Sequence, residues 1–461
     1  MSAEGLRLAQ DKMRAAGVND AAIDVFTHYY GELEAGATGL IPEETITPLL
    51  EPAHLADVEV TEEAASEALR RTAIIKLNGG LGTSMGMERA KSLLPVRDGS
   101  SFLDIIASQV SHARTEHNAP LPLVLMNSFR TREDSLEALR AHPGIEVDGL
   151  PLDFLQNKEP KLRADTLEPV EWPADPSLEW CPPGHGDIYT ALLASGVLEA
   201  LLDAGFRYAS ASNSDNLGAV PNPRIAGWFA ASGAPYAAEL CVRTLADRKG
   251  GHLAVRTADN QLILRDTAQT PPDQMHYFTD EHRHPFFHTN NLWFDLEALH
   301  RALTERGAVL GLPLIRNLKT VDPTDKASPE VFQIESAMGA AIEVFEGATA
   351  IAVERERFLP VKTTNDLLVL RSDAYRLDPD GGLRLDVAKA PLVDLDPDYF
   401  KTVTDFDARF PAGPPSLREA SSLTVRGDWT FGVGVVVRGT VTMEGSGHVP
   451  DGALLDGAQL D

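Results

Sequence analysis

A stretch rich in glycine is the first part of the sequence that could do chemistry. Residues 76–86 read KLNGGLGTSMG and begin inside the apolar run 73–77. Backbone N–H groups in such a loop can approach a phosphate chain, because glycine places no side chain in the way. Lys91, near the end of the loop, adds a compact positive charge. We therefore predict a phosphate-binding loop, against the alternatives of a structural turn and a solvated lysine.

The glycine spacing separates this loop from two common nucleotide-binding motifs. It matches neither G-x-G-x-x-G nor G-x-x-x-x-G-K-[ST]. The sequence therefore favours neither a dinucleotide-binding Rossmann motif nor the P-loop of a kinase or ATPase.

A second segment, 182–187, reads PPGHGD and stands just before a helical pattern that begins near Ile188. Its two prolines make the approach rigid, and two glycines flank His185. The imidazole and the neighbouring N–H groups can therefore face a ligand at a helix N-terminus. The competing interpretation is a histidine that is hydrogen-bonded for structural reasons.

A polar cluster ends the short apolar run 208–212. The run leads into Asn213, Ser214, Asp215 and Asn216. Open α/β sheets bind ligands at the carboxyl ends of their strands, so this cluster is a candidate binding site. Asp215 could hold a hard divalent cation through its carboxylate, or could serve as a turn or helix-capping residue.

Amide and carboxylate side chains further along the chain suit a sugar. Asn290 and Asn291 lie in FHTNNLW, Glu335 lies in QIESA, and Lys362 ends RFLPVK. The hydroxyls of a sugar ring need both donors and acceptors, which Asn and Glu supply, so we expect sugar recognition here. The histidines of the stretch 282–288 have no evident fourth partner, so zinc is not expected.

The composition excludes several classes of partner. Of 461 residues, 43% are hydrophobic and 24% charged, which is typical of a soluble globular protein. Lys and Arg total 41 against 68 for Asp and Glu, giving a formal net charge of −27. Because such a surface repels phosphate polymers, we expect neither nucleic acid nor an anionic membrane as a partner. Any phosphate-bearing ligand must be held by a local concentration of positive charge.

Cysteine content and hydropathy predict a cytoplasmic protein. Cys181 and Cys241 are too few for a disulfide framework and are typical of buried free thiols in a reducing compartment. No apolar run reaches the roughly 18 residues that a membrane-spanning helix needs. The N-terminus also lacks the apolar segment of a signal peptide.

The pattern of apolar residues predicts an α/β fold. Residues 1–40 carry apolar positions at helical spacing and predict two amphipathic helices broken near Gly17. Beyond them, short apolar runs alternate with helical stretches, which is typical of a mostly parallel sheet. The runs are 73–77, 121–126 and 208–212, and the helical stretches include 102–114 and 188–204. Residues 252–265 predict a hairpin that turns at Asp259-Asn260 and marks an antiparallel edge of the sheet.

The C-terminal part contains an internal repeat. After a turn or linker at 378–382, apolar residues recur every six positions at Val425, Phe431, Val437, Met443, Val449 and Leu455. A six-residue period predicts a left-handed parallel β-helix, whereas a β-meander with chance spacing is the alternative. The open ends of such a coil suit docking or contact between subunits, so a homo-oligomer could form there.

Together these motifs resemble one enzyme family. The strings LNGGLGTSMG with Lys91, LMNSF, PPGHGD, NSDNLG, HTNNLW and RFLPVKTTNDLL occur in the order found in eukaryotic-type UTP:glucose-1-phosphate uridylyltransferases, also called UDP-glucose pyrophosphorylases. The resemblance runs from about Gly39 to Leu455. It implies N-terminal helices over 1–45, a Rossmann-like GT-A nucleotidyltransferase core with a mixed sheet over 46–375, and a linker with a C-terminal left-handed β-helix over 376–461. It also implies Mg²⁺ as cofactor.

The resemblance assigns roles to individual residues. It places UTP on Leu77, Asn78, Gly79, Gly80, Lys91, Gln156, Gly184, Asp215 and Lys362. It places glucose 1-phosphate on His185, Asn213, Ser214, Asn290, Asn291 and Glu335. Lys91 and Lys362 would be the catalytic residues, and Asp215 would position Mg²⁺. Gln156 resembles a glutamine that reads uracil, since an amide can satisfy both the N3–H group and a carbonyl of that base.

The implied reaction is an in-line attack by a phosphate oxygen of glucose 1-phosphate on the α-phosphorus of UTP, which releases pyrophosphate. Two alternatives remain open at this point. The sugar phosphate could be that of galactose or of an amino sugar, or the protein could be a UDP-sugar sensor without activity. This chain also departs from the family pattern, with Ser84 where related enzymes place an arginine and with MERA at 87–90 in place of a Gly-Pro form.

Overall fold

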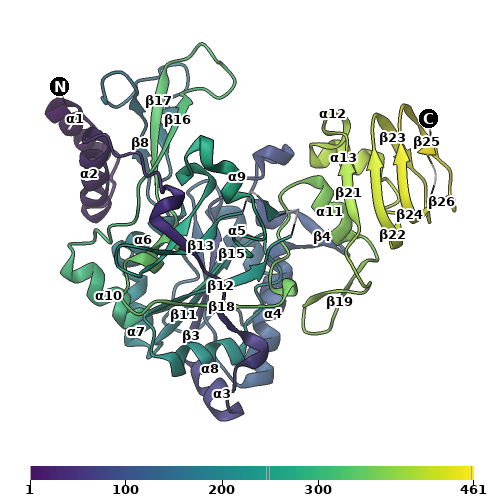
Figure 1. The fold of residues 1–461 in the computed structure, drawn as a ribbon, viewed down its shortest axis with the longest axis horizontal. Helices are drawn as coiled ribbons and strands as arrows, with labels where there is room; N and C mark the ends of the chain where they lie inside the picture. The colour runs from purple at the N-terminus through teal and green to yellow at the C-terminus, as the bar shows by residue number, and fades with distance from the viewer. Residues whose placement is uncertain (1, 245–246, 249, 458, 461) are drawn as a thin grey trace.

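An eight-stranded sheet forms the centre of the computed structural model, which describes residues 2–457 and 459–460 except 245, 246 and 249. The strand order is β2-β18-β12-β15-β11-β3-β6-β7. The strands are Ala53–His54 (β2), Thr349–Ala352 (β18), Tyr236–Val242 (β12), Phe286–Asp295 (β15), Tyr208–Asn213 (β11), Thr72–Asn78 (β3), Leu123–Asn127 (β6) and Asp153–Leu155 (β7). β15 is antiparallel to both neighbours and the other adjacent pairs are parallel. The predicted α/β class with a mixed, mostly parallel sheet is confirmed (Figure 1).

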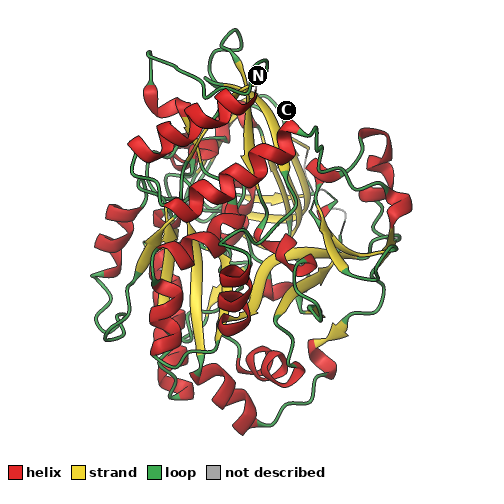
Figure 2. Ribbon diagram, turned by 90° about the vertical axis from the view of Figure 1, so that its left-hand side faces the viewer, coloured by secondary structure: helices red, strands yellow, loops and turns green. Residues whose placement is uncertain are grey.

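Both faces of this sheet are buried, which explains why its strands carry apolar residues at neighbouring positions instead of alternating with polar ones. In β3, Ile74 packs into one hydrophobic core, whereas Ala73 and Ile75 pack into another on the opposite face. The first core includes residues of α3 (Glu62–Arg70), α4 (Phe102–His117), α5 (Arg132–Leu139), α8 (Pro223–Ser232) and α11 (Thr364–Arg371). The second includes residues of α1 (Ser2–Ala15), α2 (Asp20–Glu34), α6 (Ile188–Ala194), α7 (Val197–Asp203) and α10 (Leu296–Glu305). Helices flank the sheet on both sides in Figure 2.

Local predictions were confirmed in part. The two N-terminal helices are present, and Gly17 lies between them with φ +70°. The stretch 188–204 forms two helices instead of one, because Gly196 adopts φ +74° between α6 and α7. The hairpin of β13 (His252–Arg256) and β14 (Leu262–Arg265) is antiparallel as predicted, but it is not an edge of the central sheet. It pairs instead with β1 (Ile46–Pro48) in a separate sheet, because local periodicity does not specify the partner of a hairpin.

The C-terminal part is built from parallel strands. β21 (Leu392–Leu395), β22 (Ser416–Val425), β24 (Val436–Met443) and β26 (Leu454–Asp456) pair in that order, and β23 (Asp428–Phe431) pairs with β25 (Ser446–Val449). All these pairings are parallel, which excludes the β-meander, since a meander pairs antiparallel strands. All six apolar residues of the repeat are buried. This unit lies at the right of Figure 1, away from the N-terminal helices.

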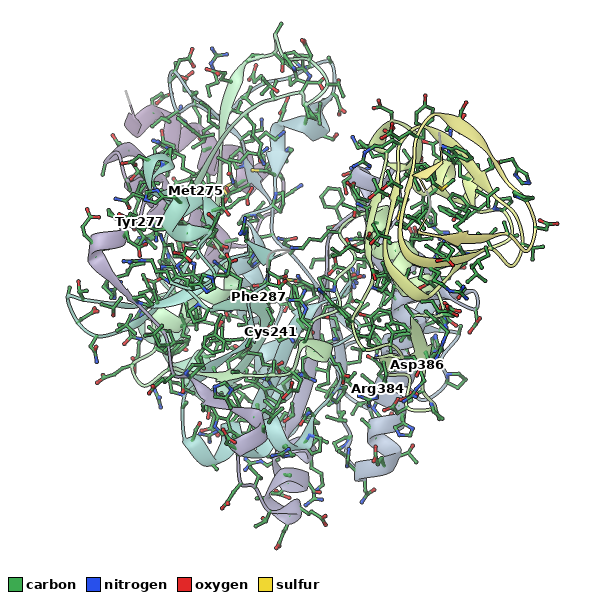
Figure 3. All side chains as sticks on the ribbon, turned by 45° about the vertical axis from the view of Figure 1, so that its right-hand side comes forward. Cys241, Met275, Tyr277, Phe287, Arg384 and Asp386 are labelled. Carbon is green, nitrogen blue, oxygen red and sulfur yellow. The ribbon has the colours of Figure 1, made fainter. Side chains whose placement is uncertain are left out.

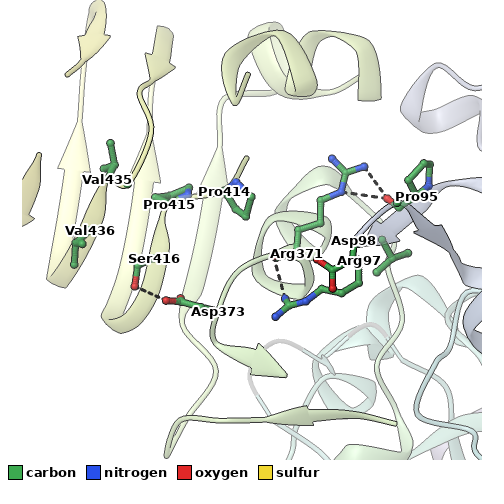
Figure 4. A pocket seen from close by; sticks show the side chains of 13 residues that line it. Pro95, Arg97, Asp98, Arg371, Asp373, Pro414, Pro415, Ser416, Val435 and Val436 are labelled. Atoms are coloured by element: carbon green, nitrogen blue, oxygen red, sulfur yellow. Dashed lines mark hydrogen bonds between the residues drawn. The ribbon is translucent and has the colours of Figure 1, made fainter. Parts of the chain in front are cut away.

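A cavity separates the C-terminal strands from part of the core. Its volume is about 640 Å³, and Figure 4 shows it between β4 (Pro95–Arg97), α11 and the C-terminal strands. Among the residues that line it, Arg371 donates to the carbonyl of Pro95 and Ser416 Oγ donates to Asp373 at 2.7 Å. Arg97 donates to the carbonyls of residues 370–372. The two arginines therefore hold β4 to the end of α11, and the bond to Asp373 joins the C-terminal strands to the core.

Smaller elements complete the fold. They are β5 (Ser100–Ser101), β8 (Glu159–Pro160), β9 (Leu162–Arg163), β10 (Trp180–Cys181), α9 (Met275–Phe278), β16 (Ile315–Thr320), β17 (Glu330–Glu335), β19 (Tyr375–Leu377), β20 (Leu383–Leu385), α12 (Pro397–Phe400), α13 (Val403–Arg409), β27 (Gln459–Leu460) and several short 3₁₀ turns. Residues 378–382 form the turn between β19 and β20, where Figure 3 labels Arg384 and Asp386.

The two cysteines behave as the sequence predicts. Cys181 and Cys241 are free and buried. Cys241 lies opposite Phe287 in the register of β12 and β15, and Figure 3 labels both near the centre of the core. In the described part of the chain, none of the helices has the length and apolar character that crossing a bilayer requires.

Candidate active site

Two adjoining cavities lie at the carboxyl ends of the central strands. The first, here called the glycine-loop cavity, measures about 280 Å³. It brings together ten predicted residues, namely Leu77, Asn78, Gly79, Gly80, Lys91, Gln156, His185, Asn213, Ser214 and Asp215. The second, here called the polar cavity, measures about 320 Å³ and is lined by the predicted residues His185, Asn213, Asp215, Asn290 and Lys362. Because His185, Asn213 and Asp215 line both cavities, the two spaces meet at these side chains.

The glycine loop is anchored where β3 ends. The side-chain nitrogen of Asn78 donates to Asn127 Oδ1 at 2.7 Å and to Ser135 Oγ at 2.8 Å, and all three side chains are buried. The loop closes where the N–H of Lys91 donates to the carbonyl of Gly80. Asn78 therefore contributes its backbone to the cavity, while its side chain fixes the start of the loop.

Lys91 and Asp215 form an ion pair at the mouth of the loop. Lys91 Nζ lies 2.6 Å from Asp215 Oδ2, and it also donates to the carbonyl of Val361. The two side chains are 19% and 21% exposed, so the pair borders the cavity without being sealed from it. The ammonium group is thus held at the point where a phosphate chain along the loop would lie.

Lys362 approaches the polar cavity from a different segment. Its side chain is exposed, and it follows Val361, whose N–H donates to the carbonyl of Asp215. Burial raises the pKa of Asp266, another residue lining this cavity, and the positive charge of Lys362 acts in the opposite direction. The two predicted lysines therefore line adjoining cavities although they lie 271 positions apart in sequence.

His185 is held in one tautomer. Its Nδ1 accepts a hydrogen bond from the N–H of Met338 at 2.9 Å, so the proton of the neutral ring resides on Nε2. Burial lowers the pKa of His185 to about 4. Burial and the nearby His185 lower the pKa of His288, which also lines the polar cavity, to about 3. His185 therefore offers a neutral N–H donor at neutral pH.

The depressed pKa of His185 predicts a loss of stability in acid. The unfolded histidine has a pKa near 6.5 and takes up its proton before the folded one, so the folded state loses stability as the pH falls from about 6.5 to 4. We expect His185→Gln, whose amide oxygen can still accept from Met338, to lose about 2 kcal/mol less than the native chain between pH 7 and pH 4.5. Urea unfolding at the two pH values measures this difference. Equal losses in both proteins would contradict it.

Gln156 is oriented by the PPGHGD segment. Its Nε2 donates to the carbonyl of Gly184 at 3.0 Å. Gly184 has φ +79°, and a Cβ there would lie 2.5 Å from the carbonyl oxygen of Ser336. A Cβ on Gly79 would lie 2.8 Å from Gln156 Oε1. Gly79 therefore leaves room for the amide of Gln156, Gly184 leaves room for the backbone of Ser336, and the amide nitrogen of Gln156 is directed at Gly184.

The structure does not place Asn291 on either cavity. Its side-chain nitrogen donates to Glu239 Oε2 at 3.1 Å, and its oxygen accepts from Asn216 Nδ2 at 3.0 Å. Asn291 is 2% exposed. Neighbouring strand residues point to opposite sides, so Asn290 reaches the polar cavity while Asn291 joins a buried polar network. The structure therefore brings Asn290, and not Asn291, to the cavity where a sugar contact was predicted.

Glu335 and Ser214 make contacts with other parts of the chain. Glu335 lines neither cavity; it ends β17, where its carboxylate lies 3.9 Å from Lys319 Nζ and its Cβ lies 3.0 Å from the Cβ position of Gly184. Ser214 lines the glycine-loop cavity, but its hydroxyl donates to the carbonyl of Leu77 at 2.8 Å. The local sequence did not reveal these contacts, because Lys319 and Leu77 lie elsewhere in the chain.

Comparison with known proteins identifies the family. The sequence profile of UTP–glucose-1-phosphate uridylyltransferase matches residues 23–438. The chain belongs to this family. It is 38% identical over 417 residues to a probable UTP–glucose-1-phosphate uridylyltransferase of Schizosaccharomyces pombe, covering 88% of this chain and 80% of that one. It is 36% identical over 472 residues to the barley (Hordeum vulgare) enzyme of the same name, covering 99% and 96%. As a uridylyltransferase of this family, the chain is a nucleotidyltransferase.

Solved structures of UDP-glucose pyrophosphorylases share the whole fold of this uridylyltransferase. The enzyme from Leishmania major is 42% identical, with a TM-score of 0.93 and coverage of 99% of both chains. A mutant of that enzyme was solved in complex with UDP-glucose and has a TM-score of 0.92. A protein described as the UDP-glucose phosphorylase of Trypanosoma brucei is 41% identical, with a TM-score of 0.91.

Further residues that the sequence did not point to also line the polar cavity, namely Asp247, Asp266, Phe287, Phe358 and Thr289. The last three lie within the motifs FHTNNLW and RFLPVK, but the two aspartates occur among many acidic residues and nothing local distinguishes them. Their arrival at the cavity depends on the hairpin β13–β14, whose partner the sequence did not specify.

The residues at the glycine loop offer a magnesium ion one carboxylate and leave its other positions to ligands that are not part of the protein. Among the described residues, no three His, Cys, Asp or Glu side chains gather closely enough to hold a metal by themselves. Magnesium in nucleotide-dependent enzymes uses one or two carboxylates and completes its shell with phosphates and waters. The carboxylate of Asp215, beside the glycine loop, suits that arrangement.

Proposed function

We propose that the chain forms UDP-glucose and pyrophosphate from UTP and glucose 1-phosphate. One observation carries the proposal: a cavity lined by a glycine loop and a second cavity lined by polar side chains meet at His185, Asn213 and Asp215. A nucleotide in the first and a sugar phosphate in the second would bring their phosphates together at this junction. Family membership and the fold shared with UDP-glucose pyrophosphorylases support the same reaction.

The glycine-loop cavity suits the uridine end of UTP. The amide of Gln156 has its nitrogen directed at Gly184, which leaves its oxygen free to accept the N3–H of uracil. The backbone of Leu77, Gly79 and Gly80 lines the same space and can donate to phosphate oxygens. Recognition of the base and of the phosphates thus lies on one loop and the segment beside it.

The reacting phosphates are served by two lysines. A phosphate oxygen of glucose 1-phosphate forms a bond to the α-phosphorus of UTP, and the bond from that phosphorus to the oxygen that bridges the α- and β-phosphorus breaks, so that this oxygen leaves as a terminal oxygen of pyrophosphate. The attacking oxygen is already ionised near neutral pH, so no general base is needed. Lys91 and Lys362 hold positive charge where negative charge accumulates, and the fixed loops place the reactants in line.

The sugar phosphate is served by the polar cavity. The Nε2–H of His185 and the amides of Asn213 and Asn290 line it and suit the oxygens of glucose 1-phosphate. Asp215 would hold Mg²⁺ together with the phosphates of UTP, and the bound ion would supply further positive charge at those phosphates. In the free enzyme, the ion pair with Lys91 keeps the carboxylate of Asp215 beside the glycine loop.

We further propose the finer features that the family resemblance implies. These are a GT-A type of core over 46–375 with helices over 1–45, a left-handed sense for the C-terminal coil over 376–461, a cytoplasmic location, and association of copies through the open end of that coil. The parallel pairing and buried six-residue repeat support the coil. Exposed Leu454 at its last strands supports a contact surface.

Pyrophosphate release in a coupled assay tests the proposal. UTP is combined with glucose 1-phosphate, galactose 1-phosphate or an amino-sugar phosphate, each with and without Mg²⁺. We expect the highest kcat/KM with glucose 1-phosphate and a requirement for Mg²⁺. A higher kcat/KM with another sugar phosphate would show that glucose 1-phosphate is not the preferred substrate. Binding of UDP-glucose without any pyrophosphate release would favour a UDP-sugar sensor.

A further inference from the structure

One buried carboxylate joins the two loops that orient the nucleotide-binding residues. Asp187 is 5% exposed. Its Oδ2 accepts a hydrogen bond from the N–H of Asn157 at 2.6 Å, and its Oδ1 accepts from Asn157 Nδ2 at 2.9 Å. Asn157 directly follows Gln156, and Asp187 stands two residues after His185. This pair of hydrogen bonds, here called the Asp187 clasp, therefore ties the Gln156 loop to the PPGHGD segment.

Helix capping does not explain Asp187. The residue stands directly before α6, where an aspartate ordinarily accepts from the first free N–H groups of the helix. Its side chain makes no such bond, because both oxygens face Asn157. Burial raises the pKa of Asp187 to about 6, while the two hydrogen bonds from Asn157 act in the opposite direction. A buried carboxylate that forgoes capping indicates that the clasp itself is the purpose of this residue.

The clasp completes the restraint of Gln156. The backbone N–H of Gln156 donates to the carbonyl of Asn127 at 2.8 Å. The side-chain Nε2 of Gln156 donates to the carbonyl of Gly184. The next residue, Asn157, is held through both its backbone and its side chain by Asp187. The amide therefore has one fixed donor end and one fixed acceptor end.

We propose that Asp187 is a positioning residue that sets the selectivity for uracil over cytosine. The proposal rests on the proposed role of Gln156 in reading the base. Uracil and cytosine present opposite donor and acceptor groups at positions 3 and 4, so an amide with fixed ends accepts one and rejects the other. When the clasp is lost, the amide can turn over to match cytosine, so UTP loses affinity and CTP gains it.

The polarity of the clasp can be exchanged, which gives a sharp test. Asp187→Ala removes both acceptors, and Asn157→Asp places two carboxylates against each other. We expect each variant to raise the KM for UTP about tenfold and to lower the ratio of kcat/KM for UTP over CTP about tenfold, with the KM for glucose 1-phosphate little changed. The double variant Asn157→Asp/Asp187→Asn restores an N–H donor facing a carboxylate. We expect it to recover both quantities to within about threefold of the native values.

A matched control separates selectivity from general damage. Asp295 is another largely buried aspartate directly before a helix, and it does cap α10 by accepting from Ala298. Asp295→Asn keeps a capping side chain and should leave the UTP to CTP ratio unchanged. Native selectivity in folded Asp187→Ala overturns the proposal. So does an equal loss with both nucleotides, or a failure of the double variant to regain selectivity over Asn157→Asp.

Failure of the proposed role of Asp187 can be told apart from failure of the proposed reaction. If the native chain releases no pyrophosphate with any sugar phosphate, the proposed reaction fails. Calorimetric binding of UTP and CTP to the native chain, the two single variants of the clasp and the double variant still measures the effect of the clasp. If the native chain is active and the variants keep their selectivity, only the role of Asp187 fails. Circular dichroism and thermal unfolding establish that each variant is folded.

Discussion

Replacing Lys362 by alanine is expected to lower kcat about 100-fold or more, with a smaller change in the KM for UTP. The side chain lines the polar cavity and is exposed, and its ammonium group has no hydrogen-bond acceptor among the described residues. Its charge is therefore free for the phosphates, where it matters most as negative charge moves onto the leaving pyrophosphate. Lys91, by contrast, is already paired with Asp215 and shares its charge. Initial rates of pyrophosphate release at saturating glucose 1-phosphate measure the effect.

Two further variants decide whether charge is the reason. Lys362→Arg keeps the positive charge and should retain more activity than Lys362→Ala, although guanidinium geometry differs from that of an ammonium group. Lys326→Ala removes an exposed lysine that lines neither cavity and should leave kcat unchanged. Substantial turnover by Lys362→Ala would remove the role assigned to this side chain, whatever the behaviour of the controls.

The sequence predicted the central strands well because burial on both faces leaves a simple signal. The short, largely apolar runs at 73–77 and 208–212 became β3 and β11, which are adjacent and parallel. The six-residue repeat marked buried positions correctly, since all six of its apolar residues are buried between parallel strands. The hairpin β13–β14 was placed on the wrong sheet, because pairing with β1 is a contact between residues some 210 positions apart.

The candidate site was predicted in outline and missed in its connections. Lys91 and Asp215 were chosen separately, but their ion pair joins residues 124 positions apart and no local pattern announces it. Asn290 and Asn291 are neighbours with the same chemistry, and only the orientation of β15 sends one to the cavity and the other into the core. Buried polar groups that join loops, such as Asp187, resemble surface residues in sequence because their partners lie elsewhere in the chain.

The buried network that excludes Asn291 from the cavity also holds the segment that carries Lys362. Arg357 donates from Nε to Glu239 Oε2 at 2.9 Å and from Nη2 to Glu239 Oε1 at 2.6 Å. The side chains are 10% and 0% exposed. From the same segment, Leu359 donates its N–H to Asn216 Oδ1 at 2.8 Å. The ion pair and Asn216 thus fix the backbone that leads to Lys362.

Arg357→Met is therefore expected to lower the free energy of unfolding by about 3–5 kcal/mol, because it leaves the carboxylate of Glu239 buried without its cation. Urea unfolding at pH 7 measures the loss. The double variant Glu239→Gln/Arg357→Met removes the stranded charge and should recover part of the stability, since the amide of glutamine can still accept from Trp293 Nε1, which now donates to Glu239 at 2.9 Å. A loss below about 1 kcal/mol in Arg357→Met, or a double variant no more stable than the single one, would contradict the role of this pair.

Because the pair supports the Lys362 segment, kcat should also fall in Arg357→Met without urea, where the protein is folded. An unchanged kcat would show that the pair contributes to stability alone.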